Sequence, residues 1–517
     1  MQGPTGGSRL DPSNGRVVLS EPGAPWWAYQ RPEPTGPPAP PAAARTTAPA
    51  EGLVNPDVAP PSTITDASLP SGVVGLTVAA GMVLATAVGA IGFGLNHLGV
   101  VLFPIAAVIA AFAFGHRCRR LRPEEPWLPR LILLGTVVKI GACAARYVTF
   151  AEVYQQIGDA FIYDREGREL VAFWNGERAT DPMGDLQITG SGLIRWLTGI
   201  VYYVFGQDLL AAFFLFGLLA VIGSYFWYRA LVDAVPYVNA RLFLIFVLFV
   251  PSIVFWPASL GKEALMQVAL GAMAWATSLI LRGRLASAVP LSLGGGLMLY
   301  LIRPHLLALV TVAAAVPYFV GRIRVGSTSF SSRPLGMVIV ALLVVFTVTA
   351  GSKFVGLENL SIDSVEEQLD AQTVSTSYGG STYSHPGNSL TNPLFLPNGV
   401  VTVLFRPFLW ESHSLFPLMA AVESTMLLGF VLGRFGAVRL AFRRCRKEPF
   451  ILYCLMLLIF YSAAFSSLAN FGLLTRQRSL VLPALYAIIA IEPARLIKHR
   501  KVEPPVQFGV APAAPVQ

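Results

Sequence analysis

The stretch SIVFWPASLGKEALMQVALGAMAWA, residues 252–276, is apolar over most of its length, yet Lys262 and Glu263 stand side by side near its centre. A charged side chain at the middle of a bilayer costs on the order of 3 kcal/mol on insertion scales. The stretch therefore belongs to a soluble core, or the charged pair lies at a membrane surface, or the pair takes part in chemistry.

The composition of the whole chain excludes the soluble core. Of its 517 residues, 54% are hydrophobic and 13% are charged, whereas soluble domains carry about 25% charged residues. The mean hydropathy is +0.59. Apolar windows of about 20 residues, the length that crosses a bilayer, recur along the chain. The sequence therefore predicts an all-α protein, a polytopic transmembrane helical bundle.

Charge and cysteine usage narrow the possible partners. The formal net charge is +9, but the basic residues fall in short segments between apolar windows, so we expect the membrane and no nucleic acid as partner. The four cysteines form no CxxC or His/Cys pattern, and we predict no metal-ligating residues.

Both ends of the chain have the composition of disordered tails. Residues 1–70 are rich in Pro, Gly, Ala, Ser and Thr, as in PEPTGPPAPPAAARTTAPA, and cannot bury enough apolar surface to fold. Residues 498–517 are similar. The transmembrane domain is therefore expected at 71–497, with two long polar loops at 151–208 and 352–412.

About twelve spans are predicted within this domain. The segment 190–206 is apolar, short and rich in aromatic residues, which indicates a helix in the membrane interface, with a thirteenth span as the alternative. The predicted spans are 72–95, 97–115, 130–150, 209–230, 240–257, 261–281, 288–303, 305–322, 335–351, 413–436, 449–467 and 478–496.

The basic segments indicate how the bundle is oriented. If 190–206 does not cross, twelve crossings place the basic segments 116–130, 434–449 and 495–501 on one side, together with both termini. Lys and Arg mark cytoplasmic loops. We therefore expect a multi-pass protein of the plasma membrane with both termini in the cytoplasm and both long loops outside.

This topology brings acids and cations from five separate segments to the outer face. Lys262 and Glu263 then start a helix at that face. Each residue alone has a structural explanation, such as a charge pair at a helix start, an arginine at lipid phosphates, or a misassigned loop. Their coincidence at one depth favours a path for a polar substrate. The residues are Asp159, Tyr163 and Asp164; Lys262 and Glu263; Arg303 and His305; Arg406, Trp410 and Glu411; and Arg476 and Arg478, placed in a last outer loop at 469–479.

Such a mixture suits a phosphate-bearing substrate. Arginine binds phosphate through paired hydrogen bonds and lysine adds a point charge. A neighbouring carboxylate can accept the proton of an attacking hydroxyl, and the cations stabilise a departing phosphate. Aromatic side chains such as Tyr163 and Trp410 can stack on sugar rings.

The order of these motifs resembles that of the polytopic GT-C type glycosyltransferases, which use polyprenyl-phosphate sugars, and of related bacterial polysaccharide polymerases. The resemblance rests on GDAFIYD at 158–164 with the helix at 190–206, on VPSIVFWPASLGKEALMQVAL at 250–270, and on YLIRPH at 300–305. It implies a lipid-linked sugar donor and a glycan or lipid acceptor.

The resemblance also implies roles for the outer-face residues. Asp159 would be the catalytic base, with Asp164 as the alternate. Lys262, Arg303, His305 and Arg406 would bind the phosphate, Glu263 and Glu411 would orient these cations or the acceptor, and Arg476 and Arg478 would contact lipid phosphate. No Asp-x-Asp pattern occurs near Asp159, so no cofactor is expected, while a requirement for a divalent metal stays open.

Three other functions fit part of the pattern. A lipid-linked polysaccharide polymerase would need similar cations. A transporter or flippase of lipid-linked sugars would need a binding site at the middle of the membrane, often with broken helices. A non-catalytic scaffold would not explain why cations converge from separate segments. The sequence thus favours glycosyl transfer.

Overall fold

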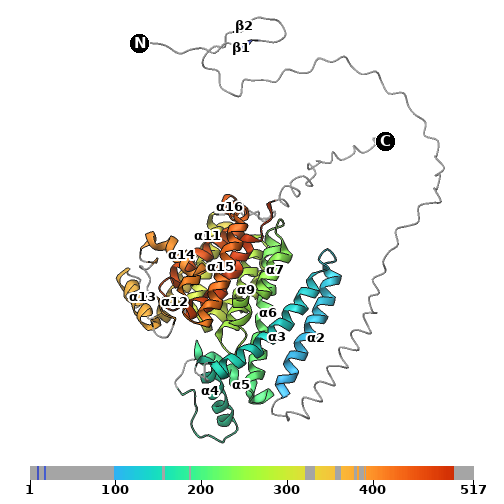
Figure 1. The fold of residues 1–517 in the computed structure, drawn as a ribbon, viewed down its shortest axis with the longest axis vertical. Coiled ribbons are helices and arrows are strands. Elements are labelled where there is room, and N and C mark those ends of the chain that lie inside the picture. Colours follow the sequence, from blue (N-terminus) through green and yellow to red (C-terminus); the bar gives the residue numbers. More distant parts are fainter. Residues whose placement is uncertain are drawn as a thin grey trace, which may run out of the picture. The chain divides into compact units, whose positions relative to one another are not determined.

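The computed structural model describes residues 9–10, 17–18, 98–153, 158–184, 188–320, 332–355, 362–377, 381–383, 389–390 and 392–493. The chain divides into two units, and the described residues of the first are the strands β1 (Arg9–Leu10) and β2 (Val17–Val18), which pair antiparallel. All the long elements belong to the second unit, which is helical (Figure 1). The predicted helical bundle is confirmed in this coarse form. The predicted span 72–95 lies outside the described residues.

The first half of the bundle is built around the helix α6, which packs along α9 and also contacts α2 and α3. At the α6–α9 crossing, a Cβ on Gly223 would lie 2.4 Å from the carbonyl oxygen of Gln267, so the two backbones touch. Small residues at helix crossings are typical of membrane bundles. The bounds are α2 (Leu98–Leu121), α3 (Leu128–Val148) with a π turn (Thr149–Val153), α4 (Asp159–Trp174), α5 (Ser191–Phe205), α6 (Leu209–Ala234), α7 (Ala240–Phe249), α8 (Pro251–Phe255) and α9 (Lys262–Leu281).

In the second half, α10 and α11 follow α9 as antiparallel neighbours, and α12 packs on α11. The helices α17 and α18 close the bundle against α11, α14 and α9. The bounds are α10 (Leu285–Ile302), α11 (Pro304–Val320), α12 (Ser332–Val355), α13 (Ile362–Thr376), α14 (Leu396–Phe405), α15 (Leu415–Gly433), α16 (Phe435–Arg444), α17 (Pro449–Phe465) and α18 (Phe471–Ile489), with short 3₁₀ turns at Pro393–Phe395 and Leu409–Glu411.

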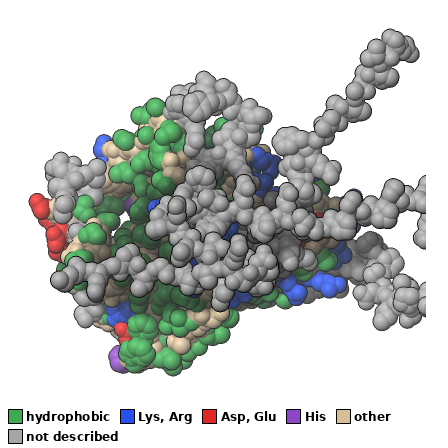
Figure 2. Space-filling view, turned by 90° about the horizontal axis from the view of Figure 1, so that it is seen from above, with side chains coloured by type: hydrophobic (Ala, Val, Ile, Leu, Met, Phe, Trp, Pro, Cys, Tyr) green, Lys and Arg blue, Asp and Glu red, His purple; other side chains and the backbone are tan. Residues whose placement is uncertain are grey.

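Six helices among the described residues are long and apolar enough to cross a membrane, or up to seven if the bent pair α15–α16 is counted as one span. Figure 2, which views the molecule from above, shows hydrophobic side chains over much of the described surface that is in view. The helices α7, α11 and α17 are apolar but have 10 to 17 residues. Each predicted span from residue 97 onward overlaps one of these helices, the α7–α8 pair or α18. The predicted interfacial segment 190–206 overlaps α5.

One predicted boundary is wrong. The segment 469–479 was expected to be a loop, but α18 begins at Phe471, so Arg476 and Arg478 lie inside a helix. The side chain of Asn470 caps this helix by accepting hydrogen bonds from the backbone of Gly472 (2.8 Å) and Leu473 (3.3 Å). The two arginines lower the mean hydropathy of the first turns of α18, so the pattern predicts a later start for this helix. In the structure both guanidinium groups have hydrogen-bond partners inside the bundle.

The buried Lys139 on α3 explains how a charge is accommodated within a span. Its ammonium donates to the carbonyl oxygens of Ile253 (3.1 Å) and Val254 (2.8 Å). Those carbonyls are in the short helix α8, where the chain breaks between α7 and Pro251. Broken helices expose backbone carbonyls that can satisfy a buried cation.

Candidate functional site

The candidate site lies at the end of the bundle where α4 and α5 are found, opposite α16 (Figure 1). Local sequence brings its residues there. Gly158, with φ of 145°, adopts a conformation that side chains disfavour and lets α4 start at Asp159. Lys262 and Glu263 form the first turn of α9, where the helix dipole favours the acid.

Two more helices contribute cations. Arg303 separates α10 from α11, and Pro304 opens α11, since proline suits the first helical turn and disfavours helix in the residue before it. Arg476 lies in the second turn of α18. We call Asp159, Glu263, Arg303, Arg476 and Gln477 the acid–arginine cluster.

Glu263 is the centre of this cluster. Its carboxylate is 2% exposed. Oε1 accepts a hydrogen bond from Nε of Arg476 at 2.7 Å and lies 3.8 Å from Nη2 of Arg303. Two arginines that are 173 positions apart in the chain thus share one buried carboxylate. Burial of a charge requires such pairing.

Each arginine also reaches a second partner. Nη2 of Arg476 lies 3.2 Å from Oδ2 of Asp159, whose side chain is 53% exposed. Nη1 of Arg303 donates to Oε1 of Gln477 at 2.5 Å. Asp159 is therefore the carboxylate of the cluster that faces solvent, and Arg476 connects it to the buried Glu263.

Lys262 gives the site an excess of positive charge. It is close enough to Arg303 and Asp159 for direct electrostatic interaction. No carboxylate of the described residues lies within 4.0 Å of its ammonium. Three cations (Lys262, Arg303, Arg476) thus stand against two carboxylates (Asp159, Glu263), which leaves one positive charge for an anionic ligand.

Tyr163 and His305 lie beside the cluster. Tyr163 is buried, and its hydroxyl is 3.5 Å from Oγ of Ser191. Burial, reinforced by Asp159 and Glu263, raises the pKa of Tyr163 to about 12, so it stays a neutral donor at physiological pH. The imidazole of His305 stacks on Phe354, with ring centroids 5.7 Å apart. Its buried Nδ1 has no hydrogen-bond partner among the described residues.

Asp164 has partners of its own away from the cluster. It accepts hydrogen bonds from the hydroxyl of Tyr202 at 2.5 Å and from Nε of Arg168 at 3.1 Å. The contact with Tyr202 joins α4 to α5, whereas Arg168 lies on α4 itself, and Asp164 is 8% exposed. The geometry thus distinguishes the two predicted acids, with Asp159 open to solvent and Asp164 holding a helix pair together.

Arg406 and Glu411 form a separate pair. The guanidinium makes a bidentate contact, with Nε 3.1 Å from Oε2 and Nη2 2.5 Å from Oε1 of Glu411. It also lies over the rings of Tyr383 (4.3 Å) and Phe471 (5.3 Å). Trp410 is 77% exposed and stacks on a neighbouring phenylalanine. Among the described residues, neither Arg406 nor Trp410 forms a side-chain hydrogen bond or ion pair with the acid–arginine cluster.

Arg478 points away from the cluster. Successive residues on a helix are about 100° apart, so residues 476 and 478 face nearly opposite directions. The buried Nη1 of Arg478 donates to the carbonyl oxygens of Leu404 (3.1 Å) and Arg406 (3.0 Å) and to Oγ of Ser424 (2.7 Å). This side chain fastens α14 and α15 to α18.

Gln477, the second partner of Arg303, is not among the residues predicted from the sequence. Its position next to Arg476 would have indicated a place in the site only if the helix were known to begin at Phe471. The hydropathy pattern placed the start of that helix later. Among the described residues, no group of three or more His, Cys, Asp or Glu side chains is placed to hold a metal ion. The site as described is an ion-pair network beside a solvent-facing carboxylate.

No family model, no curated protein and no solved structure matches the chain.

Proposed function

We propose that the protein is an integral membrane glycosyltransferase that moves a sugar from a polyprenyl-phosphate-linked donor to an acceptor on the extracytoplasmic face of the plasma membrane. The observation that carries this proposal is the acid–arginine cluster. Its carboxylates come from α4 and α9, and its cations come from the α10–α11 turn and α18, with Lys262 of α9 beside them.

The proposed topology has twelve spans and both termini in the cytoplasm. It is supported by the position of Arg434 at the far end of α18, where Nε donates to the carbonyl oxygen of Ile489 at 3.1 Å. Arg476 lies near the other end of that helix. At a rise of about 1.5 Å per residue, residues 476 and 489 are roughly 20 Å apart along the axis. The basic segment 434–449 and the cluster thus lie at opposite ends of the bundle, as the positive-inside rule requires of an outward site.

In the proposed reaction, the acceptor hydroxyl attacks the anomeric carbon of the donor sugar and loses its proton to Asp159. The bond between that carbon and the phosphate oxygen breaks, and polyprenyl phosphate leaves with the bonding electron pair. Lys262 and Arg303 stabilise the charge that develops on this oxygen. Glu263 and Arg476 hold Asp159 and Arg303 in position, and the acceptor is a glycan or a lipid.

A transfer assay in proteoliposomes tests the function. Reconstituted protein is given a polyprenyl-phosphate sugar and a hydroxyl-bearing acceptor, and both the glycoside product and movement of the lipid between leaflets are measured. The wild type should form the glycoside, and Asp159→Asn should reduce the rate by about 100-fold or more, as expected for loss of a general base. Movement without transfer would instead establish a flippase, and a product of repeated units would establish a polymerase.

Replacing Lys262 by methionine should raise the KM for the lipid-linked donor by about tenfold with a smaller change in kcat, because the neutral side chain keeps the apolar stem and loses the charge that attracts phosphate. Lys353→Met is the matched control, since Lys353 lies near the end of α12 and is not part of the cluster. Equal KM values for Lys262→Met and wild type would remove Lys262 from the phosphate site.

A further inference from the structure

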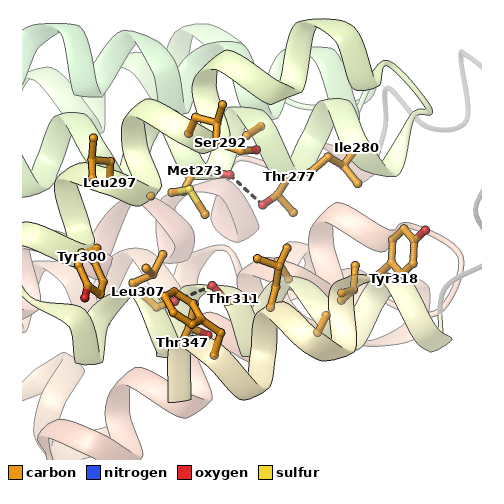
Figure 3. Close-up of a pocket in the computed structure, with 18 of the residues that line it drawn as sticks. Met273, Thr277, Ile280, Ser292, Leu297, Tyr300, Leu307, Thr311, Tyr318 and Thr347 are labelled. Carbon is orange, nitrogen blue, oxygen red and sulfur yellow. Dashed lines mark hydrogen bonds between the residues drawn. The ribbon is translucent and has the colours of Figure 1, made fainter. Parts of the chain in front are cut away.

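A groove separate from the acid–arginine cluster lies between α9, α10, α11 and α12 (Figure 3). Its volume is about 460 Å³, which is within the range of small-molecule sites, roughly 300–1,000 Å³. Carbon atoms of residues such as Met273, Leu297 and Leu307 form most of its walls. The proposed transfer reaction does not involve this groove.

The three threonine hydroxyl groups in the groove are already satisfied by their own helices. Thr277 donates to the carbonyl oxygen of Met273 at 2.8 Å, and Thr311 donates to that of Leu307 at 2.8 Å (Figure 3). Thr347 donates to the carbonyl oxygen of Val344 at 3.2 Å. These walls therefore present an apolar surface, and a polar ligand would lose its hydrogen bonds to water there. The groove suits a hydrocarbon chain.

The groove runs along the helices, and its Tyr300 end is the end nearer to Arg303 along the chain. Tyr300 lies at one end and Tyr318 at the other (Figure 3). Arg303 follows Tyr300 by three residues, a rise of about 4.5 Å, and the distance along α11 from residue 307 to residue 318 is about 16 Å. A chain whose head is held by Arg303 would therefore extend down the groove into the bundle.

The groove is open along one side. The rim residues Leu297 and Phe346 are each 59% exposed, whereas Leu307 and Ala315, on the floor, are 7% and 6% exposed. The rim is on α10 and α12, which are among the helices long and apolar enough to cross a membrane. In a bilayer this side faces the lipid chains, so a lipid tail can enter laterally while its head stays at the surface.

We propose that this groove binds the isoprenoid tail of the lipid-linked donor while Arg303 and Lys262 bind its phosphate. This inference rests on the proposed function and assigns the donor's lipid part to a place in the fold. Charge complementarity selects the occupant: an apolar groove whose lining residue Tyr300 lies three residues before Arg303, in a cluster with one excess positive charge, fits a single hydrocarbon chain with an anionic head. The tail contributes affinity through buried apolar area, and the head group fixes the position of the chain along the groove.

Gly296 provides a test variant. A Cβ at this position would lie 3.9 Å from Leu307 Cδ1 and 3.9 Å from Met273 Sδ, so a larger side chain projects into the groove at ordinary contact distance. Gly294, on the same helix, is exposed, and a Cβ there meets no heavy atom within 4 Å. Gly296→Phe and Gly294→Phe therefore make the same chemical change, one inside the groove and one outside it.

The experiment measures equilibrium binding of radiolabelled polyprenyl phosphate to purified full-length protein in detergent. Gly296→Phe should weaken binding by at least tenfold, whereas Gly294→Phe should bind like wild type. Phosphatidylglycerol in excess should compete weakly. Equal binding by Gly296→Phe and wild type would overturn the proposal, and so would full competition by phosphatidylglycerol, which would make the occupant an ordinary phospholipid.

A second measurement uses only the wild type. Polyprenyl phosphate with a photoreactive diazirine in its tail should crosslink within residues 273–347 on the groove helices; labelling confined to other helices would exclude the groove. Failure of this inference differs from failure of the proposed function. Tail binding without glycoside formation would support the groove as a lipid site and contradict the proposed transferase function. Glycoside formation that is unaffected by Gly296→Phe would support the transferase function and contradict the groove as the tail site.

Discussion

The proposed glycosyl transfer should fall by at least 100-fold when Glu263 is replaced by glutamine. The amide keeps the volume of the side chain but removes the charge that Arg303 and Arg476 share. The two guanidinium groups then repel each other, and Arg476 no longer holds Asp159 from a fixed position. Because removal of one partner from a buried ion pair typically costs about 3–5 kcal/mol, the free energy of unfolding should also decrease by a similar amount.

Both effects can be measured on the same preparation. Thermal unfolding in detergent reports the loss of stability, and transfer per folded molecule reports the loss of function. Glu366→Gln is the matched control, because Glu366 is exposed on α13 and makes the same change of charge away from the cluster. Wild-type stability and activity of Glu263→Gln would show that the buried carboxylate does not organise the site.

Replacing Arg478 by leucine should destabilise the fold without changing the chemistry. The guanidinium is fully buried and donates to two carbonyl oxygens and one hydroxyl. Leucine leaves these three acceptors without their donor, at a cost of about 1 kcal/mol or more for each, so the free energy of unfolding should decrease by about 3 kcal/mol. The protein that remains folded should transfer sugar at the wild-type rate.

The contrast with Arg476→Gln makes this prediction specific. That change removes the contacts to Glu263 and Asp159 and should lower transfer per folded molecule strongly. Arg439→Leu, at an exposed position on α16, controls for the loss of an arginine and should leave both quantities unchanged. A loss of transfer by folded Arg478→Leu, equal to that of Arg476→Gln, would contradict the separation of the two roles.

The grouping of acids and cations could be predicted in part, because topology assigns each segment to an end of the bundle. Asp159, Glu263, Arg303 and Arg476 were all expected at one face, and the structure links them by three successive ion pairs, Arg303–Glu263, Glu263–Arg476 and Arg476–Asp159. The pairing itself could not be predicted. Which carboxylate meets which guanidinium depends on the rotation of each helix about its axis.

The limits of prediction are clearest on α18. Hydropathy placed Arg476 and Arg478 together in a loop, because each arginine lowers the hydropathy of its segment whether or not the folded protein supplies a partner for the charge. In the structure both are helical, and their opposite directions give one to the ion-pair cluster and the other to the carbonyl oxygens of α14. Gln477 between them reaches Arg303. No pattern in a single sequence records such long-range partners.

The sequence by itself determined that the chain is helical and apolar enough for a membrane, and that its charged residues collect near helix ends. These properties follow from composition and from the cost of placing charge among apolar atoms, both of which are local. Only the tertiary structure decided that Glu263 is shared by two arginines, that Asp164 joins two helices, and that an apolar groove lies between α9, α10, α11 and α12. Those outcomes depend on how distant helices pack, because packing sets the distances that ion pairs and cavities require.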